Sequence, residues 1–359
     1  MRDLILVTGG SGFIGANFIL QWLQTAGSPV VNLDLLTYAG NPHNLASLRG
    51  HSRYHFVHGD ICDADLVASL LRAHRPRALV HFAAESHVDR SIHSPAAFLR
   101  TNVEGACILL EQARLYWSAL PPAERAAFRF LNISTDEIYG SLDPGGQPFT
   151  EAAPAAPSSP YAASKAAAAA FARAYFHTWS LPVLTTVCSN NYGPFQFPEK
   201  LIPLTLLNAL HGRPVPLYGD GRHLRDWLFV DDHCAALRAV LHHGSPGQIY
   251  NIGAGSPRAN LDVVTALCDL LDEMAPPLPT GPRRNLIAFV ADRPGHDRRY
   301  ALDSSRIARE LGWLPAVSFA EGLRRTVRWY LDHPDWIETT RNPSHLGWLA
   351  RQYGPGAAS

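Results

Sequence analysis

Apolar and polar positions follow two different rhythms along the first half of the chain. Short apolar runs predict buried strands, and the stretches between them carry apolar residues at helical spacing. Strands that alternate with helices in this way are typical of a parallel sheet with helices on both faces. The expected strands span residues 4–8, 30–34, 54–57, 78–83, 128–134 and 183–187, and the expected helices span 13–26, 63–74, 96–119 and 160–180.

After about residue 189 the pattern breaks into short pieces separated by proline and glycine. We expect a doubly wound parallel sheet followed by a smaller, partly interleaved C-terminal α/β domain that binds substrate. The first domain would take residues 1–189, with about 224–250 returning to it, and the second would take 190–223 and 251–359. The later elements that the pattern still predicts are a strand at 227–230 and helices at 232–243, about 303–311 and 318–332.

Composition narrows the class of protein. The 359 residues are 47% hydrophobic, which is enough for a large core and for two domains. The formal net charge is zero and no basic block occurs, so nothing predicts binding to nucleic acid or to a membrane surface. The chain also has no basic start followed by an apolar segment and no run of about 18 apolar residues. We therefore expect a cytoplasmic protein.

Cysteine and histidine give no sign of a metal site. The five cysteines are widely spaced and form no CxxC pair, which predicts reduced thiols packed as small apolar groups. The 17 histidines form no HxH or HExxH pattern, so we predict that the protein binds no metal. Lysine is rare in this chain: of the 31 lysine and arginine residues, only Lys165 and Lys200 are lysines. Either these two are chance survivors, or a compact, titratable ammonium is needed at both positions.

The string "VTGGSGFIG" places Gly9, Gly12 and Gly15 between the first expected strand and the first expected helix. Glycine allows the chain to turn sharply and to approach a pyrophosphate closely, and the helix N-terminus offers free N–H groups to phosphate. These features predict a Rossmann-type dinucleotide site. A tight turn that binds no ligand is the alternative.

An acidic residue, Asp34, ends the second expected strand about 20 residues further on, where such sites carry the acid that binds the adenosine ribose. Its carboxylate would repel a 2′-phosphate. The next two residues, Leu35 and Leu36, offer no cation to bind one. The sequence therefore favours NAD over NADP.

The string "YAASK" places Tyr161 and Lys165 one turn apart on the same face of a helix. A nearby ammonium lowers the pKa of a phenol, which would make the tyrosine a usable base near neutral pH. Such a pair is more often an exposed helix face. Here one of the two lysines occupies it, and the Pro-Ser-Ser-Pro run at 157–160 starts the helix cleanly.

Two adjacent acids, Asp136 and Glu137, follow the apolar strand at 128–134 in the string "ISTDEIYG". A solvated turn is the ordinary position of such a pair. The carboxyl ends of parallel strands are, however, where ligands bind in open α/β sheets. We therefore expect both acids, with Thr135 before them, to lie in the active site.

Together these motifs resemble the extended short-chain dehydrogenase/reductase family. Within it the chain is similar to the dTDP-glucose 4,6-dehydratases from residue 4 to about residue 333, with a weaker tail. The strings that carry the resemblance are "LTYAGN", "AAESHVDRSI", "STDEIYG", "NNYGPFQFPEKLIP", "RDWLFVDDH" and "DRPGHDRRYALD".

The resemblance implies a lyase that uses NAD to oxidise C4 of a nucleotide-bound glucose, eliminates water across C5 and C6, and returns hydride to C6. In such an enzyme Tyr161, helped by Lys165, takes the C4 hydroxyl proton, and Thr135 hydrogen-bonds the C4 oxygen. Glu137 would be the base at C5 and Asp136 the acid at the C6 hydroxyl. Burial and mutual repulsion can hold the proton on Asp136, although the two acids titrate as a coupled pair.

The resemblance also assigns binding residues. The cofactor would contact Gly9, Gly12, Phe13, Ile14, Gly15, Asp34, Leu35, Thr37, Asp60, Ile61, Phe82, Ala83, Ala84, Thr101, Tyr161, Lys165 and Asn191. The substrate would contact Ser86, Thr135, Asn190, Lys200, Leu201, Pro216, Tyr218, Arg225, Asn260, Asp292 and His296, with Lys200 and Arg225 on the diphosphate. Alternatives remain for two of these: Arg225 could pair with Asp226 or Asp231, and Asp292 with Arg293 could form a surface turn.

The chain departs from the family pattern at a few positions. Leu35 stands where lysine is common, Phe82 replaces a usual leucine, and Ala254 stands where glycine is frequent. The first could alter NAD affinity and the second is expected to change packing. The resemblance also puts Tyr353 in the substrate pocket, although the tail around it matches poorly.

Family members pair as homodimers through two helices, and the apolar content of 100–117 and 162–174 suits such a pairing. The alternatives within the superfamily are a UDP-glucose 4,6-dehydratase and a sugar-nucleotide 4-epimerase, which needs no acid pair. A non-catalytic NAD-binding regulatory protein is an alternative of another class. The implied role is deoxysugar biosynthesis, such as that of dTDP-rhamnose, but the sequence does not identify the pathway.

Overall fold

The computed structural model describes residues 3–25, 27–143, 145–340 and 347 of the chain. Its centre is a seven-stranded sheet in the order β10-β6-β5-β4-β1-β2-β3, in which every pair of neighbours is parallel. This confirms the predicted α/β class. The strands are β1 (Ile5–Thr8), β2 (Val30–Asp34), β3 (Tyr54–His58), β4 (Ala78–His81), β5 (Arg129–Thr135), β6 (Val183–Cys188) and β10 (Ile249–Ile252).

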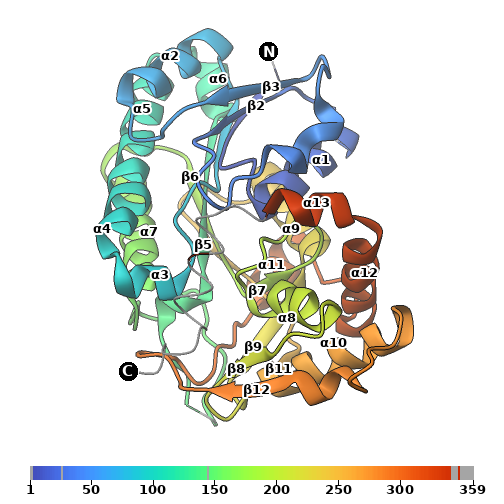
Figure 1. Cartoon of the computed structure of the whole chain (residues 1–359). Coiled ribbons are helices and arrows are strands. Elements are labelled where there is room, and N and C mark those ends of the chain that lie inside the picture. The colour runs from blue at the N-terminus through green and yellow to red at the C-terminus, as the bar shows by residue number, and fades with distance from the viewer. Residues whose placement is uncertain (1–2, 26, 144, 341–346, 348–359) are drawn as a thin grey trace.

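Helices cover both faces of this sheet (Figure 1). On one face α5 (Ala106–Ser118) packs between α2 (Ala64–His74) and α7 (Pro160–Trp179). On the other face α9 (Val230–His243) packs between α1 (Phe13–Thr25) and α11 (Ser305–Leu311). Five of these six helices follow the predicted ranges closely, and α5 is the last part of the predicted helix at 96–119.

Side-chain alternation along the strands gives each face its own core. In β1, Ile5 and Val7 belong to the cluster that contains Phe18 and Trp22 of α1. Leu6, the residue between them, belongs to the cluster on the opposite face with residues of α2 and α5. Because both faces are buried, the inner strands read as continuous apolar runs, which is why the sequence predicts them well. The edge strand β10 was not predicted.

The predicted helix at 96–119 is not uniform. It consists of α4 (Pro95–Phe98), a wider π-helical segment at Leu99–Gly105, and α5. Thr101, predicted to contact the cofactor, lies in the π-helical segment. The sequence did not predict two short helices, α3 (Val88–His93) and α6 (Pro122–Ala127). It also did not predict the short 3-10 turns at Pro42–Leu48, Asp136–Tyr139 and Arg283–Leu286.

The second half of the chain builds a separate apolar core beside the sheet edge. It contains two small sheets, one in the order β11-β9-β7 and one that pairs β12 with β8. The strands are β7 (Asn190–Tyr192), β8 (Val215–Tyr218), β9 (Leu224–Phe229), β11 (Pro257–Ala259) and β12 (Ile287–Val290). The helices are α8 (Leu201–Leu210), α10 (Asn260–Met274), α12 (Phe319–Asp332) and α13 (Pro334–Thr340).

The chain crosses between these two parts several times, as Figure 1 shows. The segment at 224–250 divides, because β9 joins a small sheet whereas α9 packs on the large one. The domain boundaries given above stay a prediction. Among the described residues, no helix combines the length and the apolar character that crossing a membrane requires.

One buried arginine supports the second core, and we predict that it contributes strongly to stability. Arg283 is 1% exposed and donates to the carbonyls of Ala209, Leu271 and Pro276 and to the Asp272 carboxylate. Arg283→Ala removes these four side-chain hydrogen bonds from a buried site and should lower the free energy of unfolding by roughly 3 kcal/mol in a urea titration followed by circular dichroism.

The neighbouring residue supplies the matched control. Arg284 pairs with Asp269 at the exposed surface, where ion pairs contribute little. Arg284→Ala should therefore leave the urea midpoint nearly unchanged. Equal losses in the two variants would contradict the role given to Arg283.

Candidate active site

A cavity of about 420 Å³ opens where the carboxyl ends of the large sheet meet the second half of the chain. Its wall includes every residue predicted for catalysis or binding except Asp136 and Asp292. Their individual roles stay predictions. Tyr353 lies outside the described residues.

The glycine turn between β1 and α1 forms one end of this cavity. Gly9 has a φ of 72°, and a Cβ there would lie 2.4 Å from the backbone nitrogen of Ala83, so only glycine fits. At Gly12 a Cβ would meet only the Gly9 carbonyl, at 3.3 Å, which leaves the space above the turn open. Asp34 is buried beside the turn and accepts the N–H groups of Ser11 and Leu36.

The predicted catalytic pair, Tyr161 and Lys165, lies on α7. This helix has a defined start, because the Ser159 side chain accepts the N–H of Ala162. Tyr161 and Lys165 are both buried and both line the cavity. Burial lowers the pKa of Lys165 to about 8. For Tyr161 the expected direction is wrong, because burial, followed by the charge of Glu137, raises the pKa of its phenol well above the usual value.

The two acids differ in position. β5 ends at Thr135, and Glu137 is among the residues that line the cavity whereas Asp136 is not. Asp136 is 3% exposed; the Thr135 hydroxyl lies 3.3 Å from one of its oxygens. The other oxygen, Oδ2, has no hydrogen-bond partner in the described part of the chain.

Their pKa values are expected to differ as well. Burial, and then the charge of Glu137, raise the pKa of Asp136 well above the ordinary value. Burial also raises the pKa of Glu137, but the cations Arg293, Lys200 and Arg225 act against that rise. These directions favour the proton on Asp136 and the negative charge on Glu137.

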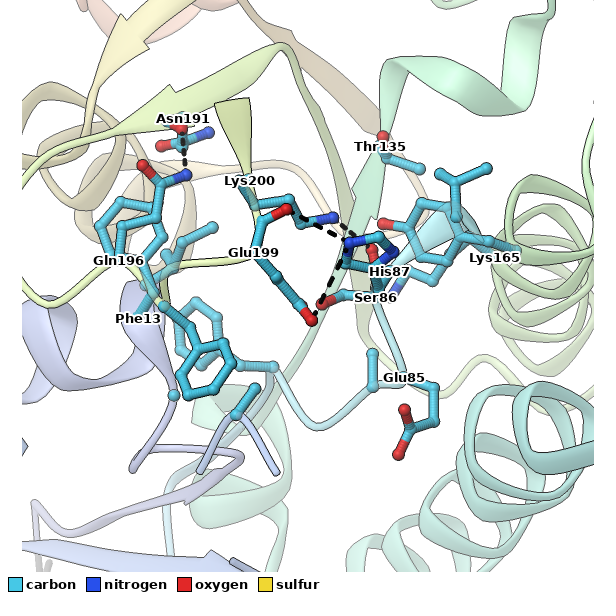
Figure 2. Close-up of a pocket in the computed structure, with 18 of the residues that line it drawn as sticks. Phe13, Glu85, Ser86, His87, Thr135, Lys165, Asn191, Gln196, Glu199 and Lys200 are labelled. Carbon is cyan, nitrogen blue, oxygen red and sulfur yellow. Dashed lines mark hydrogen bonds and ion pairs between the residues drawn. The ribbon is translucent and has the colours of Figure 1, made fainter. Parts of the chain in front are cut away.

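Lys200 and Arg225 bring positive charge to the opposite end of the cavity. Figure 2 shows Lys200 reaching toward Ser86, whose carbonyl accepts its ammonium at 2.7 Å. The Arg225 guanidinium stacks over Tyr300 at 4.3 Å and donates to the carbonyls of Leu224 and Asp297. It forms no ion pair with Asp226 or Asp231, so that alternative is wrong.

Asp292 does not line the cavity itself but contacts His296, which does. Its side chain is 40% exposed and accepts a hydrogen bond from His296, which does line the cavity. The surface-turn alternative therefore describes Asp292 well. It is wrong for Arg293, whose buried guanidinium lines the cavity and pairs with Asp89 at 3.2 Å.

The sequence missed several charged and aromatic residues of the wall. Glu85 and His87 flank the predicted Ser86, Asp89 lies two residues further along the same string, and Glu199 directly precedes Lys200. Their place in these strings was a usable signal, because side chains that flank a ligand contact at a chain turn often share its pocket. Arg293 carried the same signal, because it directly follows the predicted contact Asp292, whereas Tyr300 lies four residues beyond His296 and flanks no predicted contact.

Polar atoms without partners mark where a ligand could bind. Within the described residues these atoms are buried, have no hydrogen bond, and belong to side chains that line the cavity. Buried polar atoms are almost always paired in folded proteins, so their number here indicates a polar occupant. They are Ser134 Oγ, Ser189 Oγ, Asn190 Oδ1, Asn191 Oδ1, Gln196 Oε1, Trp227 Nε1, Asn260 Oδ1 and Arg293 Nε.

Comparison with known proteins gives one consistent result. The sequence model of the family described as GDP-mannose 4,6 dehydratase matches residues 6–326. A relative named dTDP-glucose 4,6-dehydratase, from Xanthomonas campestris pv. campestris (strain B100), is 56% identical over 340 residues. The match covers 95% of this chain and 96% of the relative.

Solved structures share the fold over almost the whole chain. DesIV, a dTDP-glucose 4,6-dehydratase from Streptomyces venezuelae crystallised with NAD bound, matches with a TM-score of 0.85 and 48% identity. That match covers 94% of this chain and 100% of DesIV. The NAD complex of UDP-glucose 4-epimerase from Thermus thermophilus matches with a TM-score of 0.79 and 29% identity, covering 91% and 99%. The fold alone therefore does not separate dehydratases from epimerases.

The buried Glu199 predicts a pH dependence of stability. Burial raises the pKa of Glu199 from 4.5 to about 7, so in that window the folded chain holds a proton that the unfolded chain has lost. Stability contributed by this group is complete below pH 4.5 and is lost as the pH rises through 7. Relative to Glu199→Gln, the wild-type free energy of unfolding should fall by about 3 kcal/mol across this range.

Urea titrations of both proteins at several pH values measure this difference. Parallel pH profiles for the two proteins would show that Glu199 titrates normally and would contradict the prediction.

Proposed function

Since the chain belongs to the GDP-mannose 4,6 dehydratase family, we propose that it is an NAD-dependent dTDP-glucose 4,6-dehydratase. It converts dTDP-glucose into dTDP-4-dehydro-6-deoxy-glucose and water. The product is a precursor for deoxysugars, of which dTDP-rhamnose is an example. The names of the similar proteins support dTDP-glucose over the GDP-linked sugar in the family's description.

One observation carries the proposal against the epimerase alternative. Tyr161, Lys165 and Glu137 line the same cavity, and Asp136 lies directly behind Thr135 in its wall. Exchange of hydride at C4 needs only the tyrosine and lysine. Elimination of water needs a further base and a further acid, which the two carboxyl groups can supply.

The residues at the glycine turn fit NAD. Gly12 leaves open space above the first turn of α1, whose N–H groups can bind a pyrophosphate. Asp34 can accept from ribose hydroxyls, and Leu35 beside it offers no cation for a 2′-phosphate. The unpaired amide oxygen of Asn191 can accept from an amide group. When bound, NAD supplies the acceptor and later the donor of hydride.

In the oxidation, Thr135 and Tyr161 hold the C4 hydroxyl. The Thr135 hydroxyl lowers the pKa of Tyr161 through a hydrogen bond, although burial prevails in the structure described here. Tyr161 therefore starts as a phenol and must give up its proton before it can accept one from C4. Lys165, with a pKa of about 8, can take up and release a proton near neutral pH and so completes this exchange.

In the elimination, Glu137 removes the C5 proton, which is acidic beside the C4 ketone. Asp136 supplies the proton with which the C6 hydroxyl leaves as water. Because Asp136 does not line the cavity, its proton must reach the substrate through the Thr135 hydroxyl or after a rotation of its own side chain. Its unpaired Oδ2 is consistent with a carboxyl group that is free to rotate.

The remaining contacts place the nucleotide diphosphate. Lys200, Arg225 and Arg293 supply three positive charges on the same wall, which suits the charge of a pyrophosphate. Asn260 and His296 border the same region. Most of these residues belong to the second half of the chain, which supports the proposed division into an NAD-binding and a nucleotide-sugar-binding domain.

The mass of the product tests the activity. Purified protein incubated with dTDP-glucose should yield a nucleotide sugar that is lighter by one water, with NAD released on denaturation. A product of unchanged mass would identify an epimerase, and no product with any of dTDP-, UDP-, CDP- and GDP-glucose would favour a regulatory protein. Preference for UDP-glucose would correct the nucleotide.

Substitution of the acids tests the mechanism. Glu137→Gln removes the base at C5 while keeping the size of the side chain, so kcat should fall by roughly 10²- to 10⁴-fold. Asp136→Asn removes the acid and should also lower kcat. NAD content and the unfolding temperature of both variants should remain near wild type, which separates a catalytic loss from misfolding. Full turnover by Glu137→Gln would exclude it as the base.

The pH profile gives a second check on the same residue. Glu137 must be ionised to act as a base, and burial raises its pKa. The wild-type kcat/KM should therefore decline as the pH falls through a value above that of an ordinary glutamate. A profile that stays flat down to the ordinary glutamate range would contradict this assignment.

We also propose that the protein is a homodimer that pairs through α5 and α7. Leu115 on α5 and Phe171 on α7 are large apolar side chains that are 49% and 42% exposed. Phe171→Glu should shift the mass in light scattering from dimer to monomer. The control Phe289→Glu, on the distant strand β12, should stay dimeric, and an unchanged mass for both variants would contradict this interface.

A further inference from the structure

The loop that follows β2 contacts both ends of the cavity. Leu35 and Thr37 line the cofactor end, whereas Tyr38 points behind the wall toward the second half of the chain. There its hydroxyl donates to Glu199 Oε1 at 3.1 Å. Glu199 directly precedes Lys200, so a single hydrogen bond separates the cofactor loop from a residue proposed to bind the substrate diphosphate.

Tyr38 is held firmly in this position. The Arg90 guanidinium of α3 lies 3.8 Å above the centre of its ring, and Phe197 packs against it edge-on at 5.8 Å. Arg90 also donates to the second carboxylate oxygen of Glu199, at 3.3 Å. Burial, and then the charge of Glu199, raise the pKa of Tyr38 well above the usual value, so its hydroxyl remains a donor.

Glu199 transmits this contact to the substrate end. Figure 2 shows its side chain extended alongside His87, whose ring contacts both its carbonyl and its carboxylate. The next residue, Lys200, is fixed by its bond to the Ser86 carbonyl. A rotation of the Glu199 side chain would therefore disturb the backbone from which Lys200 extends.

We propose that Tyr38 is a positioning residue that couples the cofactor loop to Lys200 through the Glu199 carboxylate. This inference rests on the proposed function, because it takes the two ends of the cavity as the NAD and dTDP-glucose sites. NAD would order the loop that carries Tyr38, and dTDP-glucose would order the segment that carries Glu199 and Lys200. Because the Tyr38–Glu199 bond joins these segments, the first ligand to bind lowers the conformational entropy that the second ligand has to remove. Such coupling is reciprocal: each ligand should tighten the binding of the other by the same factor.

Tyr38→Phe isolates the hydroxyl. The variant keeps the ring under Arg90 and against Phe197, and it loses only the bond to Glu199. Above pH 7, where Glu199 is ionised, this bond is made to a charged group, so at pH 8 we expect KM for dTDP-glucose to rise about tenfold, with kcat changed less than about threefold. An unchanged KM would overturn the proposal.

Because the coupling is reciprocal, the effect of dTDP on the rate of NAD release measures it. A merely structural role of Tyr38 would not change this effect. Saturating dTDP should slow the release of NAD from the wild-type holoenzyme, and Tyr38→Phe should remove most of that effect. Release that dTDP slows equally in both proteins, or in neither, would overturn the coupling. If the wild type neither binds dTDP nor dehydrates dTDP-glucose, the proposed function itself has failed, whereas normal activity with unchanged coupling defeats only this inference.

A double-mutant cycle assigns the effect to one bond. Because Tyr38→Phe and Glu199→Ala remove the donor and the acceptor of the same contact, the double variant should raise KM no further than Glu199→Ala alone, and additive effects would contradict the proposal. Tyr250 and Glu310 supply a matched control, since they form an equivalent bond of 3.1 Å away from the cavity. Tyr250→Phe should leave both KM and the effect of dTDP on NAD release unchanged; a change like that in Tyr38→Phe would show a general loss of stability.

Discussion

Removing ionisable side chains from water is the constraint on which the cavity depends. Desolvation is the largest influence on the pKa values of Asp136, Glu137, Tyr161, Lys165 and Glu199 alike. A buried charge is costly unless another charge or a hydrogen bond compensates it. The cavity wall accordingly mixes both signs: Arg90 contacts Glu199, Arg293 contacts Asp89, and the cations near Glu137 favour its ionised form. The same desolvation that makes these groups expensive moves their pKa values apart and makes them useful as acids and bases.

The parallel sheet is what brings such groups together. Because every crossover returns the chain to the same end of the sheet, the carboxyl ends of β1, β2, β4, β5 and β6 meet along one edge. Gly9, Asp34, Phe82, Thr135 and Ser189 each follow or end one of those strands, and all line the cavity. The second half of the chain then closes this edge with Lys200, Arg225 and Arg293. Neither half carries both the cofactor contacts and the positive wall.

The sequence was most informative where burial imposes a simple pattern. The range predicted for β2 is correct to the residue because the strand is buried along its whole length, is mostly apolar, and ends at a charged residue. Complete burial also explains why α8 was not predicted. Its ten residues are almost all apolar and include Pro203, so the sequence shows no amphipathic period there. α10 has such a period but is absent from the predicted helices, because the glycine- and proline-rich segment before it obscures its start. Asp136 shows a different limit: the sequence places it at the end of a strand beside Thr135, whereas its absence from the cavity lining depends on tertiary packing.

The two lysines show how composition and burial explain each other. Lys165 is fully enclosed, and burial lowers its pKa to about 8, so it can exchange a proton near neutral pH. An arginine in its place would remain charged at every pH a protein tolerates, and its larger planar group would have to fit the same enclosed space. Lys200 instead uses a small ammonium at the end of a flexible stem to reach the Ser86 carbonyl. A guanidinium is planar and presents its donors in a fixed fork, which suits the stacked position of Arg225 over Tyr300 better than this single carbonyl. A chain that otherwise uses arginine therefore has lysine where the proposed reaction moves a proton and where one compact donor fits.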